Sequence, residues 1–368
     1  MTGTVLIAGA GLAGSRVAEN LRSLGFDGRI VVAGDEPYLP YERPALSKEL
    51  LAGTRPVVAL RAATHWGDRQ IELRTGTTVT DVDSRRRTAM VGGAPLSWDA
   101  FVAATGARAR TIDGPPGVHT LRTLDDALAV REAVDESTHV VIVGAGFIGA
   151  ETASTLLPAA ASVTIVEPLP TPLARVLGPD VGTLLALRYR DHGVDLRLGR
   201  SVTRFTGNGR VRTVKLDDGT DLPADVVVVG IGAEPVSPFG GAIDVDEHGS
   251  TATDGVYACG DVASWWRPSL GKRLRVEHWT SAAGQARAVA GTIVGEPEPY
   301  DEPPYFWSDQ FGLRLQHVGH AEEWHAVVLE GDEDAFTARY VDREGRLLAA
   351  LAANQARVVP ALRQELAT

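Results

Sequence analysis

The chain has 368 residues, a formal net charge of −11, and 44% hydrophobic and 23% charged residues, a composition typical of a globular protein with two or three domains. The acidic balance argues against general nucleic-acid binding, because neutralising phosphates requires a surplus of Lys and Arg. The only cysteine, Cys259, excludes an internal disulfide, a Cys-x-x-Cys redox pair and an all-cysteine iron–sulfur site. Any redox chemistry therefore requires an organic cofactor.

Hydropathy gives no sign of a membrane segment or a secretion signal. The N-terminus has no basic region, and its apolar run is broken at Gly9. No stretch approaches the ~18 consecutive apolar residues of a membrane span. We expect a cytoplasmic protein without membrane contact.

The first predicted element is an apolar strand that leads into a glycine-rich turn. Residues 5–8 (VLIA) precede Gly9, Gly11 and Gly14 in the pattern G-x-G-x-x-G, and residues 15–24 form an Ala-rich helical stretch. A β-branched strand at 29–33 completes a β-α-β unit of a parallel sheet. Short strands at 71–74 and 88–91 follow.

The same unit returns at residue 140. Residues 140–143 (VVIV) lead into Gly144, Gly146 and Gly149, and a helix at 150–157 and a strand at 162–166 follow. Later elements are strands at 195–198, 211–216 and 225–229, a Pro-rich linker at 295–304, antiparallel strands at 324–329, 336–341 and 347–352, and a helix at 358–366. The pattern predicts an α/β fold with two Rossmann-like dinucleotide-binding domains and a small α+β C-terminal domain.

Both glycine turns meet the physical demands of dinucleotide binding. The first glycine allows a tight turn, the second lets backbone N–H groups approach a pyrophosphate, and the third lets helix and strand pack closely. A carboxylate about 20 residues further on binds a ribose hydroxyl. Asp35, with Glu36 beside it, and Glu167 stand at that spacing. Glu167 favours NADH over NADPH, because a carboxylate repels the 2′-phosphate and no basic residue follows before Arg175.

Other motifs resemble the FAD-dependent pyridine nucleotide reductases, and more narrowly the ferredoxin reductases of bacterial cytochrome P450 and aromatic-ring dioxygenase systems. They are residues 38–48 (YLPYERPALSK), 104–106 (ATG), 121–123 (LRT), 257–263 (YACGDVA), 277–279 (EHW) and 305–310 (YFWSDQ). Two features depart from that family. Residues 234–236 (EPV) lack the Asn common after the Pro, and the C-terminal domain is shorter than usual.

The resemblance implies a discontinuous FAD-binding domain at 1–112 and 237–299, an NAD-binding domain at 113–236 and a C-terminal α+β domain at 300–368. The implied FAD-binding residues are Gly9, Gly11, Ala13, Gly14, Asp35, Glu36, Arg43, Lys48, Val79, Thr105, Gly106, Arg122, Gly260, Asp261 and Trp279. The implied NAD-binding residues are Gly144, Gly146, Phe147, Ile148, Gly149, Glu167 and Gly232.

By the same resemblance, Lys48 and Glu151 are the candidate catalytic residues. Disulfide reductases carry a Cys pair near the position of Ser47, and its absence here excludes disulfide or peroxide chemistry through that loop. Lys48 is expected near the reactive edge of the flavin, where a cation stabilises negative charge. Glu151, at a helix N-terminus, is expected to pair with Lys48 and help seat the nicotinamide. The alternative is that Glu151 is an ordinary first-turn residue and Lys48 is solvated.

The implied activity is that of an oxidoreductase that takes a hydride from NADH onto FAD and passes single electrons to an acidic [2Fe–2S] ferredoxin, which serves a cytochrome P450 or a dioxygenase. Lys272, Arg273, Arg275 and Arg287 are candidate docking charges, and a solvated surface loop explains them about equally well. Two other functions stay open. One is direct reduction of a quinone, monodehydroascorbate or oxygen, and the other is a non-enzymatic redox switch. A monomer and a dimer are both compatible with the sequence.

The remaining distinctive residues have structural interpretations. Cys259 is expected to be a small buried residue after a strand. Arg85, Arg86 and Arg87 are expected in a solvated hairpin turn, and the histidines show no metal-ligand spacing, so no metal site is predicted.

Overall fold

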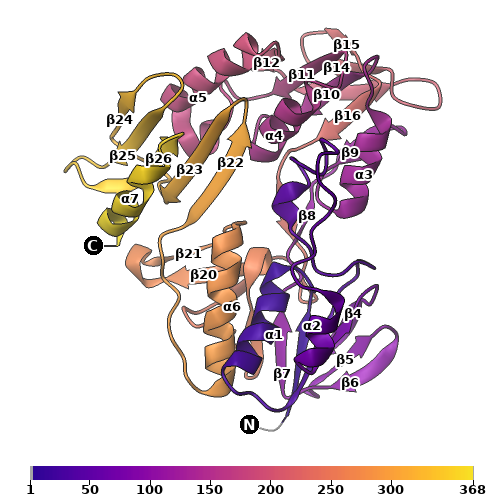
Figure 1. Ribbon diagram of the computed structural model, residues 1–368, viewed down its shortest axis with the longest axis vertical. Coiled ribbons are helices and arrows are strands. Elements are labelled where there is room, and N and C mark those ends of the chain that lie inside the picture. The colour runs from indigo at the N-terminus through magenta and orange to yellow at the C-terminus, as the bar shows by residue number, and fades with distance from the viewer. Residues whose placement is uncertain (1–2, 368) are drawn as a thin grey trace. The chain divides into compact units, whose positions relative to one another are not determined.

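The computed structural model describes residues 3–367, which form two compact units (Figure 1). The first unit is built from Met1–Glu42, Val58–Arg108 and Glu234–Pro304, and the second from Arg43–Val57, Ala109–Ala233 and Tyr305–Thr368. Residues 1, 2 and 368, at the ends of the first and last expected domains, lie outside the described residues. The expected division into three domains stays a prediction.

The first unit is centred on a parallel sheet of five strands in the order β19–β7–β1–β2–β3. These strands are β1 (Thr4–Ala8), β2 (Arg29–Ala33), β3 (Ile71–Arg74), β7 (Ala100–Ala103) and β19 (Val256–Ala258). Val5, Leu6 and Ile7 on the central strand are at most 1% exposed. Buried strands of parallel sheets have such continuous apolar runs because both of their faces are covered.

Helices and two small sheets complete the first unit. The helices are α1 (Leu12–Ser23), α2 (Ala63–Asp68) and α6 (Trp279–Val294), with the 3₁₀ turns η2 (Gly260–Val262) and η3 (Pro268–Leu270). One small sheet contains β4 (Val79–Asp83), β5 (Thr88–Val91) and β6 (Ala94–Ser97), and the other contains β18 (Ile243–Val245), β20 (Ala263–Arg267) and β21 (Lys272–Leu274). Helix α1 packs against α6 beside the glycine turn.

The second unit repeats the plan of the first. Its parallel sheet has the order β12–β11–β10–β16–β9, so the strand before the glycine turn again lies at the centre. The strands are β9 (Val118–Thr120), β10 (His139–Val143), β11 (Ser162–Glu167), β12 (Asp195–Leu198) and β16 (Val226–Val229). Around them are η1 (Arg43–Ala45), α3 (Leu124–Ala133), α4 (Phe147–Leu156), α5 (Ala174–Asp191) and the antiparallel strands β13 (Val202–Thr206), β14 (Thr213–Leu216) and β15 (Asp221–Pro223). The short strands β8 (Ala107–Ala109) and β17 (Ala233–Pro235) pair where the chain passes between the units.

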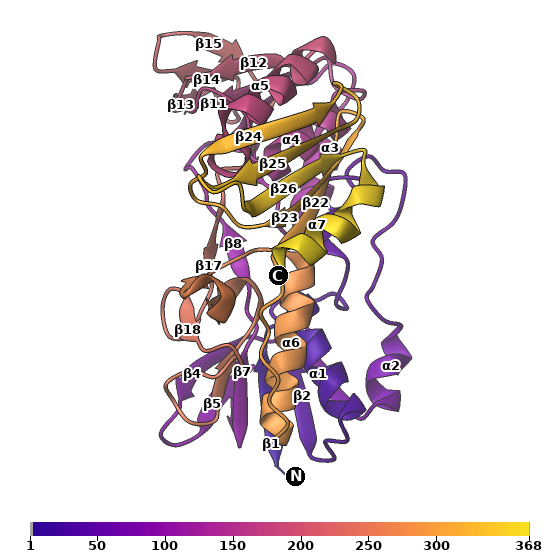
Figure 2. The same cartoon turned by 90° about the vertical axis from the view of Figure 1, so that its left-hand side faces the viewer.

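The C-terminal part of the second unit is an antiparallel sheet in the order β22–β23–β26–β25–β24, drawn in orange and yellow (Figure 2). Its elements are β22 (Tyr305–Gln310), β23 (Leu313–Gly319), β24 (Ala326–Gly331), β25 (Phe336–Val341), β26 (Leu347–Ala353), η4 (Ala356–Val358) and α7 (Val359–Leu366). Val359 and Leu362 of α7 pack on Val318 and Ala350 of the sheet. Strand β22 lies against α4.

The structure confirms the predicted fold class and most of the predicted elements. Helices α2, α3, α5 and α6 were not predicted from the sequence. Arg287, for which a solvated surface loop was one interpretation, is exposed but lies on α6. None of the helices formed by residues 3–367 has the length and apolar character needed to cross a membrane.

Candidate functional site

The first glycine turn connects β1 to α1 and leaves an open approach at one position. A β-carbon on Gly9, whose φ is +109°, would overlap the carbonyl of Ala104, and a β-carbon on Gly14 would overlap the carbonyl of Gly9. A β-carbon on Gly11, in contrast, would meet no atom within 4 Å. The fold therefore requires glycine at the first and third positions, whereas the second leaves room for a ligand against the backbone.

The second turn, between β10 and α4, has the same geometry. Gly144 has a φ of +103°, and a β-carbon there would lie 2.5 Å from the carbonyl oxygen of Gly230. A β-carbon on Gly149 would overlap the carbonyl of Gly144, whereas one on Gly146 would meet only Gly230 O, at 4.0 Å. No side chain caps the helix that follows either turn. The first N–H groups of both helices are therefore directed at a place where an anion would be stabilised.

The predicted ribose-binding carboxylates lie at the ends of the second strands. Glu167 ends β11 and is 9% exposed, and it accepts hydrogen bonds from Ala145 N at 2.7 Å and Leu169 N at 3.0 Å. These bonds fix its carboxylate beside the glycine turn. Asp35 is exposed after β2, and Glu36 accepts a hydrogen bond from the Tyr41 hydroxyl at 2.6 Å.

The motif at residues 257–263 lies beside the first glycine turn, within the same unit. Gly260 begins η2, where its N–H donates to Gln285 Oε1 at 2.8 Å. A β-carbon on Gly260 would lie 2.9 Å from Cβ of Ala13, so the backbone of Gly260 lies close against α1. Asp261 is the next residue and is therefore held beside this helix. Trp279 is the first residue of α6, which packs on α1.

The other predicted nucleotide-binding residues are found in both units. In the first, the Thr105 hydroxyl donates to the carbonyl of Val236, Gly106 has a φ of +72°, and Val79 begins β4 and packs against the core. In the second, Arg43 donates to Arg122 O at 2.7 Å, and Gly232 has a φ of +98°. The ring centroids of Phe147 and Phe306 are 4.5 Å apart, and Ile148 is 43% exposed.

Lys48 and Glu151, both in the second unit, form a largely buried ion pair. Lys48 Nζ lies 2.6 Å from Glu151 Oε2, and the two side chains are 15% and 4% exposed. Lys48 also donates to Pro44 O at 3.3 Å and lies 3.5 Å from Ser47 Oγ. A buried carboxylate without such partners would be costly, so the surroundings are built to hold this charge.

Two further partners of Glu151 were not found from the sequence. The Ser47 hydroxyl donates to Glu151 Oε2 at 2.5 Å, and the Ser308 hydroxyl donates to Oε1 at 2.6 Å. Ser47 and Ser308 are buried, at 2% and 0% exposure. They lie 104 and 157 residues from Glu151, so no local spacing could have identified them.

The candidate docking residues belong to the first unit, and all except Arg275 lie on regular elements. Lys272 and Arg273 are on β21, and Arg287 is exposed on α6. Arg273 lies 4.0 Å from Asp244 and its guanidinium covers the ring of Trp266 at 5.6 Å. Their role in docking stays a prediction.

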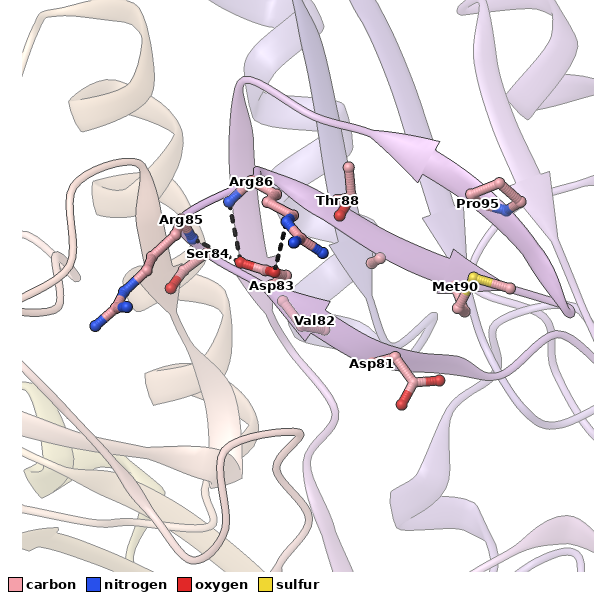
Figure 3. A pocket seen from close by; sticks show the side chains of 10 residues that line it. Asp81, Val82, Asp83, Ser84, Arg85, Arg86, Thr88, Met90 and Pro95 are labelled. Carbon is pink, nitrogen blue, oxygen red and sulfur yellow. Dashed lines mark hydrogen bonds and ion pairs between the residues drawn. The ribbon is translucent and has the colours of Figure 1, made fainter.

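The structure confirms the interpretations of Cys259 and of the arginine-rich turn. Cys259 is 0% exposed, and burial raises the pKa of its thiol to about 12. Arg85 and Arg86 are exposed in the turn between β4 and β5, where Asp83 accepts from both backbone N–H groups at 3.0 Å (Figure 3). The adjoining depression of 580 Å³ is lined by residues of this hairpin and by Pro95 of β6, and contains none of the nucleotide-binding candidates. Residues 3–367 contain no group of three or more His, Cys, Asp or Glu side chains arranged to hold a metal ion.

Comparisons with known proteins agree with this geometry. Residues 3–286 match the family described as pyridine nucleotide-disulphide oxidoreductase, and residues 305–368 match the reductase C-terminal family. The chain is 38% identical over 364 residues to the 5,5′-dehydrodivanillate O-demethylase ferredoxin reductase subunit of a Sphingobium species, covering 94% of this chain and 88% of that protein. It is 38% identical over 346 residues to the ferredoxin–NAD(+) reductase component of the biphenyl dioxygenase system of Paraburkholderia xenovorans, covering 90% and 85%.

Solved structures show the same likeness. The reductase in the covalent putidaredoxin reductase–putidaredoxin complex superposes with a TM-score of 0.93 at 31% identity, covering 99% of this chain and 93% of that chain. The resemblance thus extends past the start of the C-terminal sheet, where the sequence motifs ended.

Proposed function

This chain belongs to the pyridine nucleotide-disulphide oxidoreductase family, and we propose that it is an NADH-dependent ferredoxin reductase that carries FAD. The observation that carries the proposal is the pair of glycine turns, in which the fold itself leaves only Gly11 and Gly146 open to a ligand. One chain that repeats this turn on two parallel sheets is suited to hold two dinucleotides.

The residues of the first unit fit FAD. Gly11 opens the backbone of α1 to a pyrophosphate, and Asp261 is held next to the same helix through the close approach of Gly260 and Ala13. The exposed Asp35 stands where a ribose hydroxyl is bound in this type of turn. Three other FAD-binding residues implied by the family resemblance, Arg43, Lys48 and Arg122, belong to the second unit. When bound, FAD supplies the ability to accept a hydride and to pass on single electrons.

The second turn fits NADH better than NADPH. Glu167 is fixed by the N–H groups of Ala145 and Leu169, which leaves its charge at the position of the ribose 2′ substituent. A 2′-phosphate would meet this carboxylate directly. The names of the relatives, which include a ferredoxin–NAD(+) reductase component, support the same nucleotide.

Lys48 and Glu151 serve the hydride-transfer step. Glu151 holds the Lys48 ammonium in place, and with FAD bound this fixed cation would stabilise negative charge on the flavin ring. Because Glu151 lies in the first turns of α4, two residues after Gly149, it also stands beside the nicotinamide-binding turn. No side chain has to transfer a proton; the residues orient the two rings and supply fixed charge.

In this proposal the electron acceptor is a [2Fe–2S] ferredoxin; the names of the two relatives, both ferredoxin reductases, support a ferredoxin as the partner. A ferredoxin with an acidic surface would be attracted by Lys272, Arg273 and Arg287, which lie close in sequence to the FAD-binding Trp279. We assign the terminal enzyme to the oxygenases, either a cytochrome P450 or a dioxygenase, and we leave the choice between a monomer and a dimer to measurement.

The test is steady-state reduction of cytochrome c by the flavin-loaded protein with NADH, in the presence and absence of a [2Fe–2S] ferredoxin. We expect turnover that depends on ferredoxin, falls with rising salt and is slower with NADPH. The variant Arg287→Ala should lower kcat/KM for ferredoxin but leave reduction of ferricyanide unchanged. Arg85→Ala, which removes an exposed arginine of the β4–β5 turn, is the matched control.

Other outcomes would redirect the assignment. Equal turnover without ferredoxin would favour a small acceptor such as a quinone, monodehydroascorbate or oxygen. Slow reoxidation with a change in assembly would favour a redox switch. Either result would contradict the ferredoxin reductase function while leaving the two nucleotide sites in place.

A further inference from the structure

The Glu151 carboxylate is held by donors from two separate segments of the second unit. Ser47 and Lys48, on the loop at 43–57, contact its Oε2, and Ser308, on β22, contacts its Oε1. Both oxygen atoms are therefore occupied, and the rotation of the carboxylate is fixed from opposite ends. Thr155, one turn further along α4, also donates to Ser47 O at 2.7 Å and ties the loop to the same helix.

The contact from β22 is the last link of a longer hydrogen-bonded chain. The Tyr189 hydroxyl on α5 donates to Gln310 Oε1, Gln310 Nε2 donates to Ser308 Oγ at 2.9 Å, and Ser308 donates to Glu151. These side chains are at most 3% exposed. Burial, and then the negative charge of Glu151, raises the pKa of Tyr189 above its ordinary value, so its hydroxyl keeps its proton and acts as a donor.

The direction of this chain is determined by the charge at its end. A carboxylate can only accept, so the one hydroxyl proton of Ser308 must be donated to Glu151. Ser308 then has to accept from the NH₂ group of Gln310, which leaves the amide oxygen for Tyr189. Every donor thus points toward Glu151, and donors aligned in series strengthen one another in a low-dielectric interior.

Packing alone does not require this arrangement. The Phe311 N–H donates to Ser154 Oγ at 2.8 Å, so the end of β22 is attached to α4 without any ionised group. Buried charge networks contribute little to stability compared with apolar packing of the same volume. The network instead fixes the orientation of the Glu151 carboxylate.

We propose that Ser308, supported by Gln310, is a positioning residue for hydride transfer: the C-terminal sheet holds Glu151, and through it Lys48, in the orientation that the reaction uses. This inference rests on the proposed function of Lys48 and Glu151. It assigns to the C-terminal sheet a role in reduction by NADH, separate from any contact that this sheet makes with an electron acceptor.

The first part of the test compares a graded set of variants. Ser308→Ala should slow NADH-driven flavin reduction by about tenfold, the size expected for losing one hydrogen bond to a charged group, with little change in the Kd for NADH. Gln310→Met should have a smaller effect, and Tyr189→Phe a rate close to that of the wild-type protein. The matched control is Ser154→Ala, which loosens the same strand from the same helix without touching Glu151 and should retain the wild-type rate.

The order of the effects separates positioning from stability. A purely structural role predicts that the rate follows the melting temperature of each variant. Our proposal predicts that the rate follows the number of bonds between the altered side chain and Glu151, whatever the melting temperatures are. A rate for Ser308→Ala equal to that of the wild-type protein, in a variant that retains its flavin, would overturn the proposal.

A second readout does not depend on activity. Lys48, Lys215 and Lys272 are the lysines of this sequence, so ¹⁵N-lysine labelling gives side-chain signals that are simple to assign. Lys48 is largely buried with three acceptors near its ammonium group, and its protons should exchange slowly in the flavin-free protein. Ser308→Ala should speed this exchange by about tenfold while leaving Lys215, which pairs with Asp221 at 3.2 Å on the surface, unchanged.

The two failures can be told apart. If NADH does not reduce the wild-type flavin, the proposed function fails. The exchange rate of the Lys48 protons then still shows whether Ser308 holds Glu151 and Lys48 in place. If NADH reduces the wild-type protein but Ser308→Ala changes neither the rate nor the exchange, the positioning role fails and the proposed function stands.

Discussion

Replacing the second glycine of each turn by alanine should separate the two nucleotide sites. Gly11 and Gly146 precede α1 and α4 with φ of −68° and −75°, values that alanine adopts without strain. The added methyl group meets no protein atom near Gly11 and only Gly230 O, at 4.0 Å, near Gly146. The fold should therefore accept both substitutions, and a bound pyrophosphate should not.

The expected sizes follow from these surroundings. Alanine at an N-cap costs about 0.5–1 kcal/mol relative to glycine, and the reduced freedom of the unfolded chain returns about 0.4–1 kcal/mol, so the free energy of unfolding should change little. A phosphate pushed away by the methyl group loses one or more hydrogen bonds from the helix N-terminus, worth about 1.5–3 kcal/mol each. This corresponds to a loss of about 10- to 100-fold in affinity.

The assay measures flavin content, melting temperature and the KM for NADH with ferricyanide as the acceptor. Gly11→Ala should be purified with little or no flavin. Gly146→Ala should retain its flavin and its melting temperature but show a KM for NADH raised by about 10- to 100-fold. Each variant is the control for the other, because the substitution and its local geometry are the same. An unchanged KM in Gly146→Ala, or equal loss of flavin in both variants, would refute the assignment of the turns.

Three more predictions test other parts of the account. Gly149→Ala should lower the free energy of unfolding by about 1–3 kcal/mol in thermal or urea unfolding, because its methyl group would overlap the Gly144 carbonyl; an unchanged melting temperature would contradict the observed packing. Glu167→Gln should reduce the preference for NADH over NADPH, measured as the ratio of kcat/KM values, by about tenfold, and a constant ratio would show that this carboxylate does not select the nucleotide. Burial raises the pKa of Cys259 to about 12 from an ordinary value of 9.0, so a thiol reagent at pH 8 should label the native protein about 1000-fold more slowly than the unfolded one. The stabilisation from the protonated thiol should be lost as pH rises from 9.0 toward 12. Rapid labelling of the native protein would contradict this prediction.

The parts of the fold that follow from local sequence were predictable. Strands β2, β3, β5, β12 and β25 have the bounds expected from the pattern, because apolar or alternating runs between turn residues leave few alternatives. The glycine turns and the acids that follow them are likewise local features. Their chemistry is specified within about 25 residues of chain.

Helices α5 and α6 were not predicted because they contain glycines, which are required by packing against side chains that are distant in the sequence. Gly178, followed by Pro179, interrupts α5 with a φ of +71°, and a β-carbon there would lie 2.5 Å from the Trp324 ring. In α6, a β-carbon on Gly284 would overlap the ring of Tyr300. In single-sequence reasoning such glycines indicate breaks, whereas in the folded chain they allow close packing.

The surroundings of Glu151 could not be predicted for a related reason. Lys48 was paired with it through a family resemblance, but Ser47 and Ser308 carry no signal that distinguishes them from other serines. Their contacts join segments more than 100 residues apart, and they exist only after the loop at 43–57 and strand β22 have both packed on α4. Long-range polar contacts of this kind depend on tertiary structure alone.

The central claim is most directly tested by anaerobic double-mixing stopped-flow spectroscopy of the flavin-loaded protein. In the first mix, NADH is added and the flavin absorbance is followed; in the second, an oxidised [2Fe–2S] ferredoxin is added and its reduction is followed. We predict rapid bleaching by NADH, slower bleaching by NADPH, and then fast reduction of ferredoxin at a rate that falls with rising salt. A flavin that NADH does not bleach would contradict the central claim that this protein transfers a hydride from NADH to FAD.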